Sequence, residues 1–373
     1  MDIAMQEYFL QNRGVWLKEL FIPYTLIRQG KFPEEASNDE IQALHFCQDW
    51  LNDASTFSIR TSGSTGLPKT IQITREQMTI SAMFTGKALD LQAGDTALVN
   101  LNTRYIGGMM MLVRGFVLDL QLSIISPVML PLQDIPVSAH YDFLSFVPMQ
   151  LQATMEKSPD KISILNKAKA ILLGGAPVST LLNKQVQHIT APVYQTYGMT
   201  ETLSHIALKR LNGTQKQEYY TTLKGIKVNV DERNCLIIYT PFTASEPLIT
   251  NDIVEVLSDN TFIWMGRIDN VINTGGVKVQ AEKVEKVVEE VLLEIGMHCR
   301  FFVGALPHPR LGETVTLFVE KNYLLPAQEV ELLHKAAACL SRFEKPTSVI
   351  CIPEFLETPT GKIDKINTLQ LLH

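Results

Sequence analysis

One short segment constrains this chain more than any other, because it gathers residues that bind phosphate. Residues 60–70 read RTSGSTGLPKT, which combines hydroxyl residues with two glycines and a lysine. Glycine lets backbone N–H groups approach an anion closely, and successive N–H groups in a turn form an anion-binding nest. The residues predicted to bind phosphate are Thr61, Ser62, Gly63, Ser64, Thr65, Gly66 and Lys69.

The surroundings of this segment differ from those of a P-loop. Residues 57–59 and 70–73 are each typical of a short strand, so the loop connects strand to strand. A P-loop places its lysine directly after the last glycine, whereas Lys69 lies three residues after Gly66. An ordinary surface turn remains the alternative for a Ser-Gly cluster alone, but the full string is much rarer. We therefore expect a polyphosphate-binding loop that belongs to neither a kinase nor a P-loop ATPase.

Composition narrows the class of protein. The 373 residues are 46% hydrophobic and 19% charged, which suits two or so globular domains. The net charge of −6 disfavours non-specific binding of nucleic acid. The five cysteines are scattered, as is typical of a reducing compartment, and no signal peptide or membrane-spanning run is visible. We expect a cytoplasmic protein without a transmembrane segment, and the sequence leaves its oligomeric state open.

Apolar runs separated by helix-length segments predict an α/β sheet in the first part of the chain. Residues 1–56 are expected to be mostly helical scaffold, and shorter strands after about residue 213 predict a small β subdomain. The predicted large N-terminal domain, residues 1–268, is therefore α/β, with stacked sheets, helices and that subdomain. Residues 269–373 predict a small mobile α+β C-terminal domain. The expected buried strands are residues 98–101, 122–125, 143–147 and 170–173.

Two strand ends, one at Leu173 and one in residues 193–197, run into glycine-rich or polar turns, where open α/β sheets bind their ligands. Gly174, Gly175 and Ala176 form one such turn, and Tyr197 lies in the other. They predict the walls of a nucleotide pocket. Glu201 follows Tyr197 closely and is suited to Mg²⁺, which prefers carboxylate and phosphate oxygens together. A solvated glutamate at the start of a helix is the alternative.

Two later segments complete the set of motifs. Asp252 lies just before a strand, where it either binds a ribose diol or shapes a turn. Residues 266–278 mix charges, hydroxyls and glycines at the expected domain boundary. Residues 358–365 form a Pro/Gly turn that presents Lys362 on an exposed loop.

Taken together, these segments resemble the adenylate-forming superfamily of acyl-CoA synthetases, luciferases and peptide-synthetase adenylation domains. The resemblance covers roughly residues 57–367, and its motifs occur in the family's order. Residues 198–207 are similar to those of compact o-succinylbenzoate–CoA ligases of menaquinone biosynthesis. The matching motifs are residues 61–69, 174–177, 197–201, 250–252, 266–269 with Gly275-Gly276, and 359–362.

The chain departs from the family pattern in several places. It is short for the family, with an opening subdomain that looks trimmed. Asn251 replaces the glycine of the usual Thr-Gly-Asp, and the proline common after the double glycine is replaced around Val279-Gln280. The usual histidine-bearing segment before the second helix reads Asn-Thr-Arg-Tyr at residues 102–105. This last change alters the expected acid pocket.

The resemblance implies two half-reactions, with ATP and coenzyme A as co-substrates and Mg²⁺ as the metal. A carboxylate attacks the α-phosphorus of ATP, and the thiol of coenzyme A then displaces AMP. Thr200 is implied to donate to the α-phosphate, Glu201 to hold Mg²⁺, and Lys362 to bridge the carboxylate and the α-phosphate. Adenine and ribose are implied to contact Gly174, Gly175, Ala176, Tyr197, Asp252 and Arg267.

The second half-reaction is implied to follow a rotation about a hinge at Asp269. This rotation brings Gly275, Gly276 and Lys278 near the pocket. For o-succinylbenzoate, one carboxylate stays unreacted and needs a cationic partner if it is buried. The first candidate for that partner is Arg104, with Ser204 and His205 as helpers. A surface salt bridge is the alternative for Arg104, and a packed polar side chain is the alternative for His205.

The sequence thus favours an AMP-forming acid–CoA ligase that acts on o-succinylbenzoate. The alternatives are a CoA ligase for another aryl or fatty acid, and a stand-alone adenylation domain that loads a carrier protein. A non-catalytic protein that keeps only the nucleotide-binding shell is a further alternative. A protein that only binds the nucleotide has no physical need for all five charged residues, so their presence disfavours this alternative. They are Lys69, Glu201, Asp252, Arg267 and Lys362.

Overall fold

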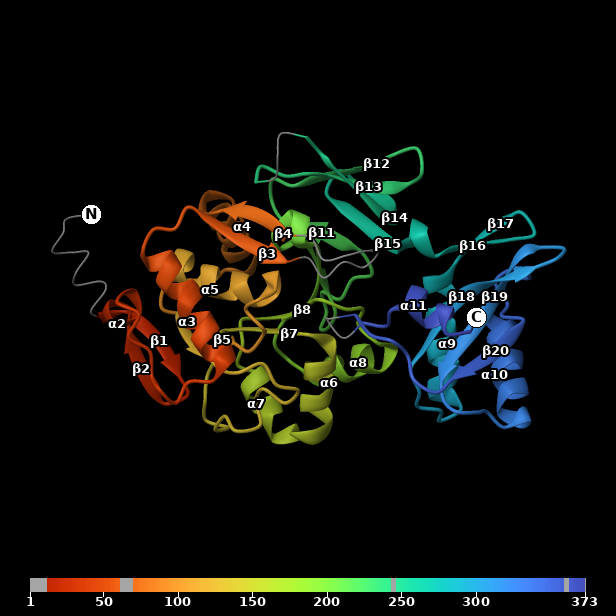
Figure 1. Ribbon diagram of the computed structural model, residues 1–373, viewed down its shortest axis with the longest axis horizontal. Coiled ribbons are helices and arrows are strands. Elements are labelled where there is room, and N and C mark those ends of the chain that lie inside the picture. The colour runs from red at the N-terminus through yellow and green to blue at the C-terminus, as the bar shows by residue number, and fades with distance from the viewer. Residues whose placement is uncertain (1–11, 61–69, 243–245, 359–361, 373) are drawn as a thin grey trace.

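A computed structural model of the chain describes residues 12–60, 70–242, 246–358 and 362–372 (Figure 1). The larger of its two units is built on one sheet of thirteen strands in the order β12-β13-β14-β15-β11-β10-β9-β8-β7-β5-β6-β1-β2. The strands are β1 Gly14–Leu17, β2 Leu20–Pro23, β5 Thr96–Val99, β6 Gln121–Ile124, β7 Phe143–Phe146, β8 Ala170–Leu173, β9 Val193–Gly198, β10 His205–Arg210, β11 Tyr220–Thr222, β12 Lys227–Val230, β13 Cys235–Tyr239, β14 Leu248–Ser258 and β15 Thr261–Arg267.

The sheet changes character at β9. Along the path β1-β6-β5-β7-β8-β9 each strand pairs parallel with the next, whereas β2 pairs antiparallel with β1, and β10 and the strands beyond it pair antiparallel. From β5 the chain passes to β6 on one side and then to β7 on the other. Such a reversal creates a crevice at the carboxyl ends of the strands, where ligands bind in open α/β sheets.

Helices cover both faces of the parallel strands, because successive side chains of a strand point to opposite faces. Ala97 and Val99 pack with α3, α4 and α5, while Leu98 packs with α6, α7 and α8. Figure 1 shows these two helical layers on either side of β7 and β8. The helices are α2 Tyr24–Arg28, α3 Asn38–Leu51, α4 Arg75–Leu89, α5 Ile106–Leu118, α6 Pro148–Lys157, α7 Ile162–Leu165 and α8 Thr180–Gln185.

The expectation that residues 1–56 are mostly helical is wrong for one segment. Residues 14–23 form the hairpin of β1 and β2, which turns at Lys18 with a φ of 55°. Strand β1 pairs parallel with β6, so this hairpin extends the edge of the sheet. The sequence analysis missed this hairpin because its partner, β6, lies about 100 residues further along the chain.

The small unit has its own sheet and its own hydrophobic core. Its strands have the order β17-β16-β19-β18, and β20 pairs parallel with β19. Helices α9 and α10 share one core with this sheet, while Phe302, Phe318 and Phe355 form a second cluster. No helix in the described ranges is long and apolar enough to cross a membrane. The elements are β16 Val271–Thr274, β17 Val277–Gln280, α9 Ala281–Glu294, β18 Phe301–His308, β19 Gly312–Glu320, α10 Pro326–Cys339, β20 Ser348–Ile352 and α11 Lys365–Gln370.

Two adjacent glycines of α5 allow a test of its packing. A Cβ on Gly108 would lie 2.5 Å from the carbonyl oxygen of Asn102, whereas a Cβ on Gly107 would meet only Leu101, at 3.7 Å. Gly108→Ala should therefore lower the free energy of unfolding by about 1–3 kcal/mol. Gly107→Ala should leave it unchanged or raise it by up to about 1 kcal/mol, since alanine favours a helix. Urea unfolding of both variants measures this, and equal effects would contradict the packing.

Candidate active site

The predicted walls of the nucleotide pocket lie side by side. Gly174 directly follows β8, and its backbone N–H donates to the carbonyl of Phe146 at 3.1 Å. A Cβ on Gly174 would lie 2.7 Å from Oγ1 of Thr196 on the neighbouring strand β9. The two turns therefore meet at the carboxyl ends of adjacent parallel strands.

A buried carboxylate connects this edge of the sheet with the second half of the predicted site. Asp252 on β14 is only 7% exposed. Its Oδ2 accepts a 2.6 Å hydrogen bond from the Tyr197 hydroxyl, and its Oδ1 accepts from Trp264 Nε1 at 3.2 Å. Burial and the charge of Asp252 raise the pKa of Tyr197, which stays a neutral donor. Asp252 is thereby held in one orientation at the predicted ribose position.

Arg267 extends this arrangement to the hinge. Its Nη1 lies 3.7 Å from Asp252 Oδ1, and its Nη2 lies 2.5 Å from Asp269 Oδ2. Asp269 belongs to a 3₁₀ helix, η4 (Ile268–Asn270), that links the two units. Asn251 also donates to Asp269, at 3.3 Å. The predicted hinge is therefore bonded to the predicted ribose-binding residues.

Lys362 lies on the C-terminal segment and faces the same place. Its backbone N–H donates to Thr358 Oγ1 at 3.2 Å. Although its side chain is exposed, the protein atoms around it and the charge of Arg267 lower the pKa of Lys362. Lys362 of the small unit therefore lies within electrostatic range of Arg267 of the large one.

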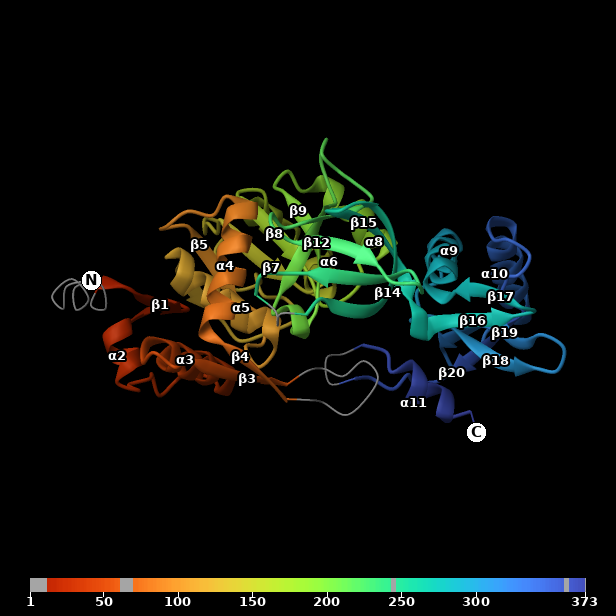
Figure 2. The same ribbon diagram turned by 90° about the horizontal axis from the view of Figure 1, so that it is seen from above.

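The phosphate loop itself, Thr61–Lys69, lies outside the described residues, as do residues 359–361 of the C-terminal turn. The strands on either side of the loop, β3 (Thr56–Arg60) and β4 (Thr70–Thr74), form an antiparallel pair. The expected strand–loop–strand context is therefore confirmed. Figure 2 shows this pair pointing towards the small unit.

Thr200 and Glu201 lie in a 3₁₀ turn, η3 (Thr200–Thr202), directly after β9. Glu201 is exposed and makes no hydrogen bond or ion pair within the described part of the chain. No group of three or more metal-ligating side chains occurs among the described residues. A single free carboxylate fits a Mg²⁺ ion that takes most of its ligands from phosphate and water.

Ser204 and His205 meet a different arginine from the expected one. Ser204 contacts Arg114 on α5, a side chain that is only 3% exposed, and His205 lies within electrostatic range of it. Arg114 Nη2 donates to Ser204 Oγ, while its Nε has no hydrogen-bond partner among the described residues. Burial lowers the pKa of Arg114 to about 9. Arg114 is therefore a buried cation with no acidic residue of the described ranges at ion-pair distance.

His205 completes this polar cluster. Its Nε2 lies 3.2 Å from Thr85 Oγ1 on α4, and its Nδ1 lies 3.3 Å from Ser204 Oγ. Burial and the charge of Arg114 lower the pKa of His205 well below its usual value. Leu203, just before, adopts a φ of 64°, an uncommon conformation for a branched residue. We call Thr85, Arg114, Ser204 and His205 the Arg114 cluster.

Arg104 does not join this cluster. It lies before α5, is exposed, and donates to Oε1 of Gln42 on α3. The sequence analysis missed Arg114, whose signal was a single charge within an otherwise apolar helix. It also missed Trp264. A third residue that it missed is Asn100, which follows β5 and is fully buried. Neither polar atom of its side chain has a hydrogen-bond partner in the described part of the chain.

Gly275, Gly276 and Lys278 lie apart from the predicted nucleotide site. The two glycines form the turn between β16 and β17 with φ values of 58° and 80°, and Lys278 is exposed on β17. Figures 1 and 2 show β16 and β17 extending away from the large unit. The structure does not bring these residues to Arg267 or Asp252.

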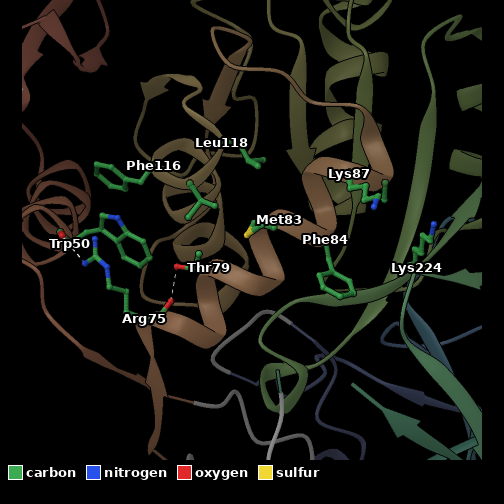
Figure 3. Close-up of a pocket in the computed structure, with 11 residues that line it drawn as sticks. Trp50, Arg75, Thr79, Met83, Phe84, Lys87, Phe116, Leu118 and Lys224 are labelled. Atoms are coloured by element: carbon green, nitrogen blue, oxygen red, sulfur yellow. Dashed lines mark hydrogen bonds between the residues drawn. The ribbon is translucent and has the colours of Figure 1, made fainter. Parts of the chain in front are cut away.

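A separate surface groove of about 950 Å³ lies on the outer face of α4 (Figure 3). Its lining includes Trp50 and Phe116, and the Arg75 guanidinium stacks over the Trp50 ring at 4.0 Å. Its lining shares no residue with the predicted nucleotide site or with the Arg114 cluster.

Comparison with known proteins identifies the family of this chain. The sequence pattern of the AMP-binding enzyme family matches residues 23–232, which is more than half of the chain. The chain belongs to the AMP-binding enzyme family. This finding confirms the resemblance inferred from the motifs.

A solved member of similar size supports the assignment to this family. The chain is 42% identical to an acyl-CoA synthetase (AMP-forming)/AMP-acid ligase II-like protein from Dyadobacter fermentans. The match covers 94% of this chain and 98% of that one, with a TM-score of 0.62. The α/β fold class expected from the sequence is confirmed.

More distant family members carry more specific names. The chain is 24% identical to the 2-succinylbenzoate–CoA ligase of Haemophilus influenzae over 80% of this chain and 66% of that protein. It therefore spans slightly less than two thirds of that relative. O-succinylbenzoate coenzyme A synthetase (MenE) from Bacillus subtilis, solved with ATP and magnesium ion, is 19% identical with a TM-score of 0.68. That match covers 84% of this chain and 69% of the other, and it shows a shared fold.

The lowered pKa of His205 makes stability depend on pH. Below about pH 6.5 the unfolded chain binds a proton at this histidine that the folded chain excludes. The free energy of unfolding should therefore fall as the pH drops from about 6.5 towards the folded pKa, by up to about 1.4 kcal/mol per pH unit. Denaturant unfolding between pH 7.5 and 5 should show a shallower slope for His205→Gln. His188→Gln is the control, since His188 is exposed; an unchanged slope in both variants would contradict the burial effect.

Proposed function

We propose that this protein is an AMP-forming acid–CoA ligase and that its acid is o-succinylbenzoate. The ligase class is supported by the family and by the 42% identical acyl-CoA synthetase-like relative. The single observation that carries the choice of acid is Arg114, a buried cation whose neighbours are Ser204 and His205.

In the first half-reaction the acid attacks the α-phosphorus of ATP, and pyrophosphate leaves. The residues Thr61–Lys69 bind the leaving phosphates, and Thr200 donates to the α-phosphate. The ammonium of Lys362, within electrostatic range of Arg267, bridges the attacking carboxylate and the α-phosphate and stabilises charge in the transition state. Glu201 would hold a Mg²⁺ ion, which would supply positive charge to the phosphates.

The nucleoside is held by groups that the structure already orders. Gly174, Gly175 and Ala176 line one side of adenine, and Tyr197 lines the other. Asp252 and Arg267 bind the ribose hydroxyls. Because Tyr197 and Trp264 fix the Asp252 carboxylate, this acceptor is preorganised before the nucleotide arrives.

In the second half-reaction the thiol of coenzyme A attacks the acyl-adenylate and AMP leaves. We propose that rotation about Asp269 withdraws Lys362 and brings Gly275, Gly276 and Lys278 to the pocket. Arg267 and Asn251 both bond to Asp269, so this rotation changes contacts of the ribose-binding residues.

For o-succinylbenzoate, the succinyl carboxylate reacts while the aromatic carboxylate remains an anion. A buried anion requires a cationic or hydrogen-bonding partner. Arg114 replaces Arg104 as that partner, because Arg114 is buried with Ser204 while Arg104 bonds to Gln42 at the surface. The names of the distant relatives support the same acid. We place the enzyme in menaquinone biosynthesis in the cytoplasm.

Acid-dependent exchange of pyrophosphate into ATP tests this function. The panel is o-succinylbenzoate, benzoate, a medium-chain fatty acid and several amino acids. Exchange with o-succinylbenzoate alone, followed by thioester formation with coenzyme A, is the expected result. Exchange with another acid would keep the ligase class and discard this substrate. An adenylate that forms but is passed only to a carrier protein would replace the ligase with a loading domain.

The role of Arg114 is tested with a matched pair of arginines and a matched pair of acids. Arg114→Gln should raise the KM for o-succinylbenzoate about 100-fold, because a buried carboxylate loses its charged partner. It should have little effect on 4-oxo-4-phenylbutanoate, which lacks the aromatic carboxylate. Arg104→Gln, the surface control, should change neither KM. An Arg114→Gln protein that folds normally and still discriminates between the two acids would contradict the assignment.

A further inference from the structure

Helix α9 of the small unit carries two glutamates that contact the large unit. The apolar side chains of α9, such as Val284 and Val288, lie in the core of the small unit. Glu282 and Glu289 are seven residues apart, which is about two helical turns, so they lie on one side of the helix. That side packs against β15 and α8 of the large unit.

Glu289 makes the contact farther from the hinge. Its Oε2 accepts from the Thr180 hydroxyl at 2.8 Å and from the Thr180 backbone N–H at 3.1 Å. Thr180 begins α8, shortly after the predicted adenine turn at residues 174–177. One carboxylate oxygen thus binds both donors of a residue that lies just beyond the nucleotide site, and such charge-assisted bonds are among the stronger hydrogen bonds in proteins.

Glu282 makes the contact at the hinge itself. Its Oε1 accepts from Asn270 Nδ2 at 2.6 Å and from the Arg267 backbone N–H at 3.3 Å. A Cβ on Gly266 would lie only 2.5 Å from Glu282 Oε2, so a larger residue there would displace this carboxylate. This bond holds the first turn of α9 against the end of β15.

The two contacts respond differently to a movement of the small unit. Glu282 lies beside η4, while Glu289 lies about 10 Å further along the helix, at 1.5 Å per residue. A rotation about Asp269 therefore displaces Glu289 from Thr180 more than it displaces Glu282 from Asn270. Lys362 belongs to the same small unit and moves with α9.

We propose that Glu289 is a positioning residue. Its bonds to Thr180 hold the small unit in the orientation in which Lys362 lies beside Arg267. The inference rests on the proposed function only for what Lys362 does at that position. Loss of the bonds releases Lys362 from the site and slows the half-reaction that needs it.

The kinetic test compares Glu289→Ala with Glu290→Ala, a neighbouring glutamate that is exposed. Glu289→Ala should lower the rate of acid-dependent pyrophosphate exchange about tenfold, as expected for the loss of charge-assisted bonds. It should leave thioester formation from supplied acyl-adenylate and coenzyme A within about twofold. Glu290→Ala should change neither. Thr180→Val should give a smaller loss, and the double variant should lose less than the product of the two single losses.

A second measurement does not depend on catalysis. The pH dependence of acylation of Lys362, followed by mass spectrometry of its peptide, reports the pKa of this lysine. Glu289→Ala should raise that pKa towards the ordinary value, because Lys362 then lies farther from the charge of Arg267 and from the protein atoms around it. Glu290→Ala should leave it as in the unaltered protein.

The outcomes separate this inference from the proposed function. If no acid supports exchange but Glu289→Ala shifts the titration of Lys362, the positioning role stands and the proposed function fails. If Glu289→Ala resembles Glu290→Ala in both measurements, the positioning role is wrong. Equal slowing of both half-reactions, with an unchanged titration of Lys362, would show general destabilisation and also overturn it.

Discussion

The carboxylate of Asp252 is the interaction on which the arrangement of the site depends. A buried carboxylate is costly unless donors surround it, and here Tyr197, Trp264 and Arg267 surround it from two strands. Arg267 continues the network to Asp269, and its charge acts on Lys362. One buried acid therefore couples the end of β9 to the hinge, so the position of each constrains the other.

The Arg114 cluster differs from the surroundings of Asp252, because its buried charge is positive and has no partner of opposite sign among the described residues. Arg114 is buried beside His205, whose neutral form is favoured, and no acidic side chain of the described part compensates the cation. Such a cation weakens the folded state until an anion reaches it. Under the proposed function, the substrate's unreacted carboxylate supplies that anion. Binding of the acid and stability of the fold are then linked, because a ligand that binds only the folded state stabilises it.

Sequence reasoning succeeded where the information is local and failed where it depends on pairing through space. The strand–loop–strand context at residues 57–73 follows from adjacent residues, and the structure confirms it. The motif strings indicated the family for the same reason. The hairpin at residues 14–23 was missed because its partner is β6. Arg104 was chosen because glycines follow it closely, and Arg114 was missed because its contact with Ser204 spans 90 residues.

The long-range pairing in the large sheet also affects how the chain folds during its synthesis. Strand β1 finds its parallel partner only in β6, and β11 finds its second neighbour only in β15, which ends at Arg267. During synthesis, β1 therefore waits for β6, which ends at Ile124, and one edge of β11 remains open until Arg267, when more than two thirds of the chain has been made. Long-range pairing of this kind folds slowly and exposes edges that can aggregate. The continuous sheet that aligns the site thus leaves strand edges open in the nascent chain until its later strands have been made.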